Sequence, residues 1–191
     1  VIGSIEAGAD MIVTGAGFSR DIFKIGKKYN IPIVSIVSSV SFAKLAEKLG
    51  AAAVIVEASE AGGHIGTDVS LRELFPATRK AISKIPLIAA GGITDGYEMA
   101  EMIDEYGADG IQIASRFVLS EECSVSQEFK ETFLNARKED IVLVSSPVGL
   151  PGRAIKTPFV EKMLGNKDIA AKTCQYKCLK KCDYKYCISE R

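Results

Sequence analysis

Five short apolar runs alternate with amphipathic stretches along most of the chain. The runs are Asp10–Thr14, Pro32–Ser38, Ala51–Val56, Pro86–Ala90 and Gly110–Ala114. Each run is nearly continuously apolar rather than alternating between apolar and polar residues, which is typical of strands buried on both faces. The sequence therefore predicts a parallel sheet covered by helices, built from βα units.

The stretches around these runs have the apolar spacing of amphipathic helices. We expect Ser41 and Asp95 each to cap a helix, because a short polar side chain can accept a backbone N–H group there. The predicted helices are the end of one over Val1–Ala9, then Arg20–Tyr29, Ser41–Leu49, one from Asp68 or Ser70 to Lys84, one from Asp95 to Tyr106, and Ser126–Asn135.

A short repeat marks the places where a helix gives way to a strand. Three segments each end a helix and start a strand: Gly8–Asp10, Gly50–Ala52 and Gly107–Asp109. The strands between them begin with Ile31-Pro32 and Ile85-Pro86. Repeated units of this kind favour a (β/α)8 barrel over a Rossmann sheet. No strand is followed by Gly-x-Gly-x-x-Gly, the fingerprint of a dinucleotide site.

A complete barrel takes roughly 250 residues and eight strands. The predicted fold is therefore an α/β TIM barrel represented by its C-terminal five βα units, with the N-terminal part missing. A first residue of Val1 rather than Met agrees with that expectation. We expect a partial barrel domain at 1–140, a Pro/Gly-rich loop region over the barrel at 141–165, and a Cys/Lys-rich tail at 166–191.

Composition narrows the classes of partner. Lys plus Arg and Asp plus Glu both number 24, so the zero net charge gives no case for nucleic acid or an anionic membrane as partner. No apolar run reaches the ~20 residues that span a bilayer, and we expect no signal peptide. Five cysteines, an odd count, then indicate reduced thiols and a cytoplasmic protein.

The loop after the third predicted strand, Glu57–Gly66, contains the only histidine of the chain, His64. Gly62 and Gly63 precede it and let the backbone approach a bound group. A strand that ends in a glycine-rich loop with a lone histidine has the layout of an active-site loop. The alternative is that His64 is an ordinary surface residue in a flexible turn.

Two further strand ends carry unusual residues. The fourth strand ends in Gly91-Gly92, and the fifth is followed by Ser115. Bare N–H groups there, leading into a helix N-terminus, would cradle a phosphate, and phosphate sites after strands seven and eight are common in this fold. The alternative is that Gly91-Gly92 is only a tight turn.

Three motifs taken together resemble one family. Glu60–Gly66, Ile88–Ile93 and Gln112–Phe117, in this order and spacing, are similar to the flavin-dependent nitronate monooxygenases, formerly called 2-nitropropane dioxygenases. That family in turn resembles the FMN-dependent enoyl-acyl-carrier-protein reductases. The similarity extends over essentially all of 1–160.

The resemblance implies an activity, FMN-dependent oxidation of nitronates or nitroalkanes with dioxygen, and a role for each matching residue. His64 would be the catalytic base, a task that suits imidazole because it titrates near neutral pH. Gly63 would approach the flavin. The residues that would hold the FMN phosphate or lie beside it are Gly91, Gly92, Gln112, Ala114 and Ser115.

Two features depart from the family pattern. Ala114-Ser115 stands where many members have Gly-Thr, which keeps the hydroxyl group. The family's first strand and its loop contact the isoalloxazine ring, and we expect residues 1–191 to contain no counterpart of them. Alternatives are therefore kept: an FMN-dependent NAD(P)H enoyl reductase, a non-catalytic fragment with a thiol or metal-binding tail, and a phosphate-binding barrel isomerase. The oligomeric state is left open, a homo-oligomer included.

The remaining segments carry weaker signals. Pro and Gly within Ser145–Ile155 argue against a regular helix or central strand, so we expect a loop there. It is either a lid in which Arg153 binds an anionic group or a structural crossing in which Arg153 forms a salt bridge. The tail carries weak candidate ligands for zinc or an iron–sulfur cluster, at spacings that match no standard metal motif: Cys174, Cys178, Cys182 and Cys187.

Overall fold

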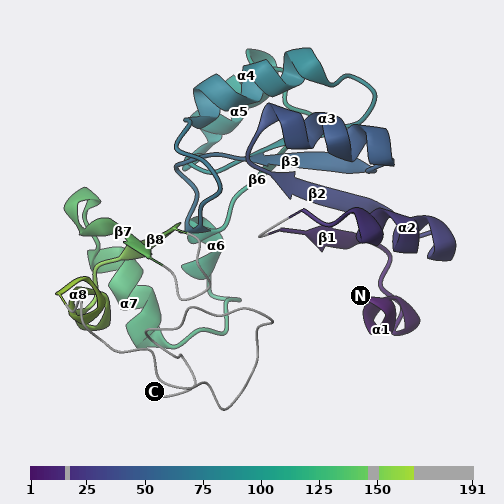
Figure 1. Ribbon diagram of the computed structural model, residues 1–191. Coiled ribbons are helices and arrows are strands. Elements are labelled where there is room, and N and C mark those ends of the chain that lie inside the picture. The colour runs from purple at the N-terminus through teal and green to yellow at the C-terminus, as the bar shows by residue number, and fades with distance from the viewer. Residues whose placement is uncertain (16–17, 146–150, 166–191) are drawn as a thin grey trace. The chain divides into compact units, whose positions relative to one another are not determined.

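The computed structural model describes residues 1–15, 18–145 and 151–165 (Figure 1). The chain divides into two compact units, which are described separately. Unit 1 contains Val1–Ala61 and Gly66–Arg116, and unit 2 contains Gly62–Ile65 and the chain from Phe117 onward. Within the described ranges, no helix is both long and apolar enough to cross a membrane.

Unit 1 is built on a five-stranded sheet in which every neighbouring pair is parallel. The strand order follows the chain order without a reversal. This confirms the five predicted strands, four with slightly narrower bounds than the apolar runs and the third ending one residue later, at Glu57. The strands are β1 (Ile12–Thr14), β2 (Ile33–Val37), β3 (Ala53–Glu57), β5 (Leu87–Ala90) and β6 (Gly110–Gln112).

The helices of unit 1 follow the predicted sequence ranges closely, and the second matches its predicted range at both ends. They are α1 (Ile2–Glu6), α2 (Arg20–Tyr29), α3 (Val40–Leu49), α4 (Leu71–Ala81) and α5 (Gly96–Asp104). A further short helix, α6 (Ser115–Val118), was not predicted, and it begins in unit 1 and ends in unit 2. Asp95 caps α5 as expected, since its carboxylate accepts the Glu98 N–H group at 2.9 Å.

Several helix ends differ from the prediction: α1 ends at Glu6 rather than Ala9, α5 ends at Asp104 rather than Tyr106, and α3 and α4 differ as follows. Ser39, not Ser41, caps α3, because the Ser39 hydroxyl accepts the Phe42 N–H group at 3.3 Å. Ser41 lies inside the helix. Helix α4 begins after Ser70 and ends at Ala81, so the alternative start at Asp68 and the end at Lys84 were wrong. The buried positions Leu71, Leu74, Phe75 and Thr78 fix the extent of this helix.

Helices α2 to α5 pack on one face of the sheet, as Figure 1 shows for α3 and α4. Phe23, Ala46 and Phe75 join the same buried cluster as Val54 and Val56 of β3. Because successive strand residues point to opposite faces, the other face is formed by the alternate positions. Those residues form a second, smaller cluster made only of strand residues: Val34, Ile36, Ala53, Ile55, Ile88 and Ala90.

The repeat seen in the sequence has a structural cause. Gly8, Gly50 and Gly107 follow α1, α3 and α5, and all three have positive φ values, of 90°, 90° and 70°. A glycine ends a helix in this way because the left-handed conformation costs it little. Pro32 directly precedes β2, and its carbonyl accepts the Ile12 N–H group at 3.0 Å. The repeat therefore marks the helix-to-strand turn of each unit.

Asp109 joins the start of β6 to its neighbours. One carboxylate oxygen accepts the Leu87 N–H group and an Arg79 guanidinium N–H group, both at 2.7 Å. The bond from Leu87 lowers the pKa of Asp109, with a smaller contribution from Arg79. A carboxyl group whose folded pKa is lowered stabilises the fold above its unfolded pKa, and the effect fades as the pH falls through the folded value.

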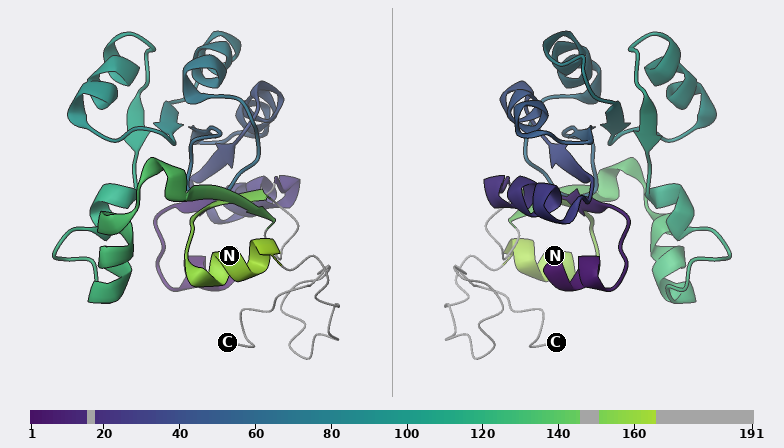
Figure 2. Two further views of the ribbon diagram at one scale, coloured as in Figure 1. Left: turned by 90° about the vertical axis from the view of Figure 1, so that its left-hand side faces the viewer. Right: turned by 90° about the vertical axis from the view of Figure 1, so that its right-hand side faces the viewer.

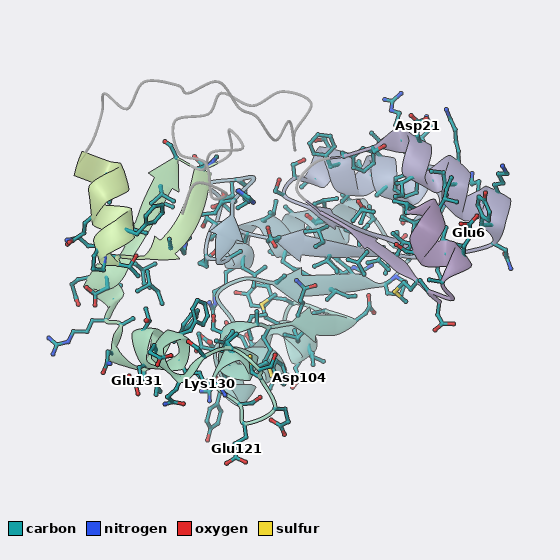
Figure 3. The ribbon with its side chains drawn as sticks, turned by 90° about the horizontal axis from the view of Figure 1, so that it is seen from below. Glu6, Asp21, Asp104, Glu121, Lys130 and Glu131 are labelled. Atoms are coloured by element: carbon teal, nitrogen blue, oxygen red, sulfur yellow. The ribbon has the colours of Figure 1, made fainter. Side chains whose placement is uncertain are left out.

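We therefore expect Asp109→Asn to lower the free energy of unfolding by about 1 kcal/mol at neutral pH, a small value because the side chain is half exposed. The difference from the original protein should shrink below pH ~4, where the aspartate begins to be protonated. Urea unfolding at a series of pH values measures it. Asp104→Asn, on the exposed end of α5 (Figure 3), is the control. A difference that stays constant with pH would contradict this role for the charge.

Unit 2 contains a three-stranded antiparallel sheet with the order β4-β8-β7. Strand β4 is Gly63–His64, β7 is Ile141–Ser145 and β8 is Pro151–Ile155. The helices are α7 (Gln127–Asn135), the 3₁₀ helix η1 (Lys138–Asp140) and α8 (Pro158–Gly165). Figure 2 shows β7 and β8 as neighbouring ribbons with α8 beside them.

The expectation of a loop over Ser145–Ile155 was wrong for its described part. Strand β8 is the central strand of this sheet and pairs with both β4 and β7. Pro151 is compatible with this place because it is the first residue of the strand, where only its carbonyl oxygen is needed. That oxygen accepts the Ile65 N–H group at 2.8 Å. The division at 140 and 165 stays a prediction, and 166–191 lie outside the described residues.

Helix α7 agrees with its predicted range. Ser126 caps it by accepting the Phe129 N–H group at 3.3 Å. Lys130, labelled in Figure 3, donates to the Ser120 carbonyl at 2.6 Å. This bond ties the segment between α6 and α7 to the helix.

Candidate functional site

The turn that follows β3, Ala58–Ala61, is bound to two other parts of unit 1. The Ala58 N–H group donates to the Ala90 carbonyl at the end of β5, at 3.3 Å. The Ser59 N–H group donates to the Val69 carbonyl just before α4, at 3.0 Å, and the Ala61 N–H group closes the turn on Ala58 at 3.2 Å. The segment that leads to Gly62 and His64 therefore starts from a fixed point at the carboxyl end of the sheet.

Gly91 and Gly92 pack directly on this turn. Their φ values are 93° and 74°, in the left-handed region. A Cβ atom on Gly91 would lie 2.9 Å from the Ala61 backbone nitrogen, and one on Gly92 would lie 2.8 Å from Glu60 Cβ. The two glycines are therefore required by conformation and by close packing on residues 60–61. This packing gives a structural reason for the glycines and does not decide between a tight turn alone and a phosphate site, so both stay predictions.

The chain returns to unit 1 at Gly66, which packs against Ser38, the residue after β2. No Cβ atom fits there, because it would overlap the Ser38 hydroxyl. Both segments that flank Gly62–Ile65 are thus held at carboxyl ends of parallel strands, Ala61 beside Gly91 and Gly66 beside Ser38. Active-site residues of barrel enzymes lie at this end of the strands.

Gly63 and His64 form strand β4 of unit 2. In the register, His64 lies opposite Gly152 and Gly63 lies opposite Arg153. His64 is exposed and Ile65 beside it is buried. The histidine is thus held in a paired strand rather than in a flexible turn. The structure also places Arg153 within strand β8, so the expected loop setting was wrong, whereas a role in anion binding or in a salt bridge stays a prediction.

The loops after β5 and β6 are joined through a residue to which the sequence gave no role. The Arg116 Nε–H group donates to the Thr94 carbonyl, which links the start of α6 to the turn before α5. Gln112 ends β6 and lies opposite Ala90, and Ala114 and Ser115 are exposed just beyond it. The structure therefore brings together the glycine turn and the Gln112–Ser115 segment. The one available signal for Arg116 was its positive charge beside Ser115.

The start of α5 is already occupied by carboxylates. Asp95 accepts the Glu98 N–H group, and Glu98 accepts the N–H and hydroxyl groups of Thr94 at 2.6 and 2.8 Å. An anion would meet two negative charges at this helix N-terminus. A phosphate held here would therefore rely on the backbone of the two turns and on Arg116, and the expectation that the N-terminus of α5 contributes is not supported.

The expectation of a metal site can be compared with the structure only for the described residues. Within residues 1–15, 18–145 and 151–165, no cluster of three or more His, Cys, Asp or Glu side chains is placed to hold a metal ion. Cys123 is half-buried and takes part in no disulfide. The four cysteines of the tail lie outside the described residues, so metal binding there stays a prediction.

Comparison with known proteins identifies the family. The nitronate monooxygenase family model matches residues 3–184, nearly the whole chain. A probable nitronate monooxygenase of Staphylococcus aureus strain MSSA476 is 31% identical over 153 residues. The chain therefore belongs to the nitronate monooxygenase family, which confirms the resemblance seen in the sequence. That match covers 76% of this chain but only 43% of the relative.

Solved structures agree on the fold. FabK from Thermotoga maritima superimposes with a TM-score of 0.76 and 37% identity, covering 83% of this chain and 50% of that one. A nitroalkane oxidase from Streptomyces ansochromogenes gives a TM-score of 0.72 at 24% identity, covering 84% of this chain and 49% of that one. The second comparison supports the α/β fold alone. The chain thus spans about half the length of the proteins it matches.

Proposed function

We propose that this chain supplies the catalytic histidine and the phosphate-binding turns of an FMN-dependent nitronate monooxygenase, an oxidoreductase that oxidises nitronates or nitroalkanes with dioxygen. The observation that carries the proposal is the anchoring of the Gly-Gly-His segment of a family member at the carboxyl ends of parallel strands. Ala61 packs on Gly91 and Gly66 packs on Ser38, on either side of His64 in the sequence.

We also propose that the five βα units are the C-terminal part of a (β/α)8 barrel. A doubly wound sheet has a reversal of strand order and helices on both faces. Unit 1 has strands in chain order and helices α2 to α5 on one face, and its other face is apolar at Val34, Ile55 and Ile88. The share of the relatives' length that the chain spans agrees with a partial barrel.

The residues of unit 1 fit an FMN phosphate. The Gly91-Gly92 and Ala114-Ser115 turns follow neighbouring strands, and bare backbone at such turns can form an anion site. Ser115 adds a hydroxyl group, and Arg116 places a guanidinium charge between the two turns. Gln112 completes the proposed set of unit 1, and the role of Gly63, a residue of unit 2, near the flavin is proposed from the family resemblance alone. Arginine suits this place because its planar fork binds phosphate oxygens in pairs.

The mechanism follows from what these groups can do. His64 would accept the proton from the carbon next to the nitro group, since a neutral imidazole is a base matched to neutral pH. The paired strand β4 holds its backbone in place during that transfer. Bound FMN would supply the electron chemistry with dioxygen, for which protein side chains are unsuited. The protein's part is to fix the substrate, hold the cofactor and move one proton.

The visible absorption spectrum of the purified chain, with and without added FMN, tests the proposal. The same measurement should be made on a longer chain that continues upstream of Val1, if the gene encodes one. We expect a bound-flavin spectrum, and then oxygen uptake on addition of a nitronate without NAD(P)H. Failure of both chains to bind flavin would refute the oxygenase assignment. Binding by the longer chain alone would support the partial barrel.

Arg116→Gln should weaken FMN binding about tenfold, because one charged hydrogen bond and one positive charge are lost beside the proposed phosphate position. Fluorescence titration of FMN at low and high salt measures the effect. Arg116→Lys should recover part of the salt-sensitive affinity, since it restores the charge but not the Nε–H donor to Thr94. Arg137→Gln, an exposed change in unit 2, is the control. Equal affinity in Arg116→Gln and the original protein would remove Arg116 from the site.

A second candidate is the FMN-dependent NAD(P)H enoyl-acyl-carrier-protein reductase. The observation that favours it is the 37% identity to FabK, against 24% to the nitroalkane oxidase. The two candidates differ in the reductant. Oxidation of NAD(P)H that depends on an enoyl thioester would support the reductase, whereas oxygen uptake that depends on a nitronate would support the oxygenase.

Other expectations from the sequence stay as proposals. We keep a small-molecule substrate, a cytoplasmic location and an open oligomeric state. A non-catalytic fragment with a thiol or metal-binding tail also remains a candidate. It would be favoured by metal bound at Cys174, Cys178, Cys182 and Cys187 in a chain that binds no flavin.

A further inference from the structure

We infer that Glu60 is a positioning residue that holds the turn before His64 and the glycine turn of the proposed phosphate site in one arrangement. The inference rests on the proposed function for its catalytic consequence and on the contacts within unit 1 for its geometry. Glu60 lies in the turn Ala58–Ala61, directly before Gly62-Gly63-His64.

The Glu60 carboxylate is bound on one side to helix α4. Its two oxygens accept the Leu71 N–H group at 3.1 and 3.2 Å. Ser70, the N-cap residue of this helix, makes no side-chain cap bond. Glu60 therefore provides the cap acceptor from eleven positions upstream, and its negative charge also faces the positive end of the helix dipole. The Ser59 hydroxyl donates to the same carboxylate at 3.1 Å.

The other side of Glu60 faces the glycine turn. A Cβ atom on Gly92 would lie 2.8 Å from Glu60 Cβ and 3.1 Å from its Cγ, so the Glu60 stem fills the space beside Gly92. The adjoining Ala61 backbone does the same beside Gly91. One side chain thus touches the glycine turn through its stem and the start of α4 through its carboxylate.

If Glu60 positions the two segments, its substitution should have effects that the loss of a residue important only for stability would not have. Loss of the carboxylate frees the turn before His64 from α4 and loosens its packing on Gly91-Gly92. Both segments should then become more mobile together, while the rest of the sheet is unchanged. Because catalysis depends on the position of the base, kcat should fall about tenfold or more, with a much smaller change in KM.

The experiment compares Glu60→Ala and Glu60→Gln with Glu73→Ala, an exposed carboxylate in the first turn of the same helix. Amide hydrogen exchange should speed up in peptides covering 58–66 and 91–95 of Glu60→Ala, but not in β2. Glu60→Gln should restore part of the protection, since an amide oxygen still accepts the Leu71 N–H group. Glu73→Ala should match the original protein in both segments.

The experiment distinguishes failure of the proposed function from failure of the positioning role of Glu60. If the original protein neither binds FMN nor takes up oxygen, the proposed function fails, and hydrogen exchange still decides whether Glu60 holds the two segments together. If exchange in Glu60→Ala rises only at the start of α4, or matches that of Glu73→Ala, the positioning role is overturned. With active protein, equal kcat values for Glu60→Ala and the original would overturn it too.

Discussion

His64→Gln should lower turnover of a neutral nitroalkane by about a hundred- to ten-thousandfold, the range that a positioned general base contributes. The same substitution should reduce oxidation of the preformed nitronate far less, because that anion has already lost its proton. His64 is exposed on strand β4, so the change removes no packing from the core. Oxygen uptake with each form of the substrate, at saturating FMN, measures the two rates.

The comparison between the two substrates isolates the proton transfer. Asp68→Asn, an exposed titratable residue in the same connection, controls for loss of a polar side chain nearby. Flavin content and the thermal unfolding midpoint should be the same in all three proteins. If His64→Gln slows the nitronate as much as the nitroalkane, His64 acts in a step other than proton abstraction. If it slows neither, His64 is not catalytic.

Gly91→Ala should destabilise unit 1 by about 2–3 kcal/mol and abolish retention of FMN. The φ value of 93° is one that alanine adopts only with strain. The added methyl group would also lie 2.9 Å from the Ala61 backbone nitrogen, which cannot move without shifting the whole turn. Urea unfolding and flavin fluorescence give the two readouts.

Substitutions at two other glycines distinguish the conformational cost of Gly91→Ala from the cost of its close packing on Ala61. Gly8 has a φ value of 90° with open space around it, so Gly8→Ala should show only the conformational cost, about 1 kcal/mol. Gly96, in the first turn of α5, has no positive φ and no neighbour within 4 Å, so Gly96→Ala should be neutral or stabilising. A Gly91→Ala effect no larger than that of Gly8→Ala would show that packing on Ala61 contributes nothing.

Local sequence was enough to place the five strands and the main helices of unit 1, though not every helix end. The apolar runs, the cap at Asp95 and the glycines at helix ends each act within a few residues, so they can be recognised one at a time. The family could also be recognised, because three motifs occur together in a fixed order. The roles of His64, Gly91, Gly92, Gln112, Ala114 and Ser115 remain predictions.

The contacts that distant segments make could not be predicted in the same way. Ser39 and Ser41 are both suitable caps, and the choice depended on which helix register buries Ala43 and Ala46 against the sheet. Pro151–Ile155 contains Pro and Gly, so it was expected to be a loop. It became a central strand because β4 and β7 pair with its two edges.

The sequence by itself therefore determined the alternation of strands and helices, the parallel sheet and the family. The tertiary structure decided why Gly91 and Gly92 must be glycine, what Glu60 binds and how Arg116 joins two loops. The physical reason is the separation along the chain between the residues that interact. A strand or cap is encoded by neighbouring residues, whereas a contact between Glu60 and Leu71 or Arg116 and Thr94 exists only after the sheet has brought their loops together.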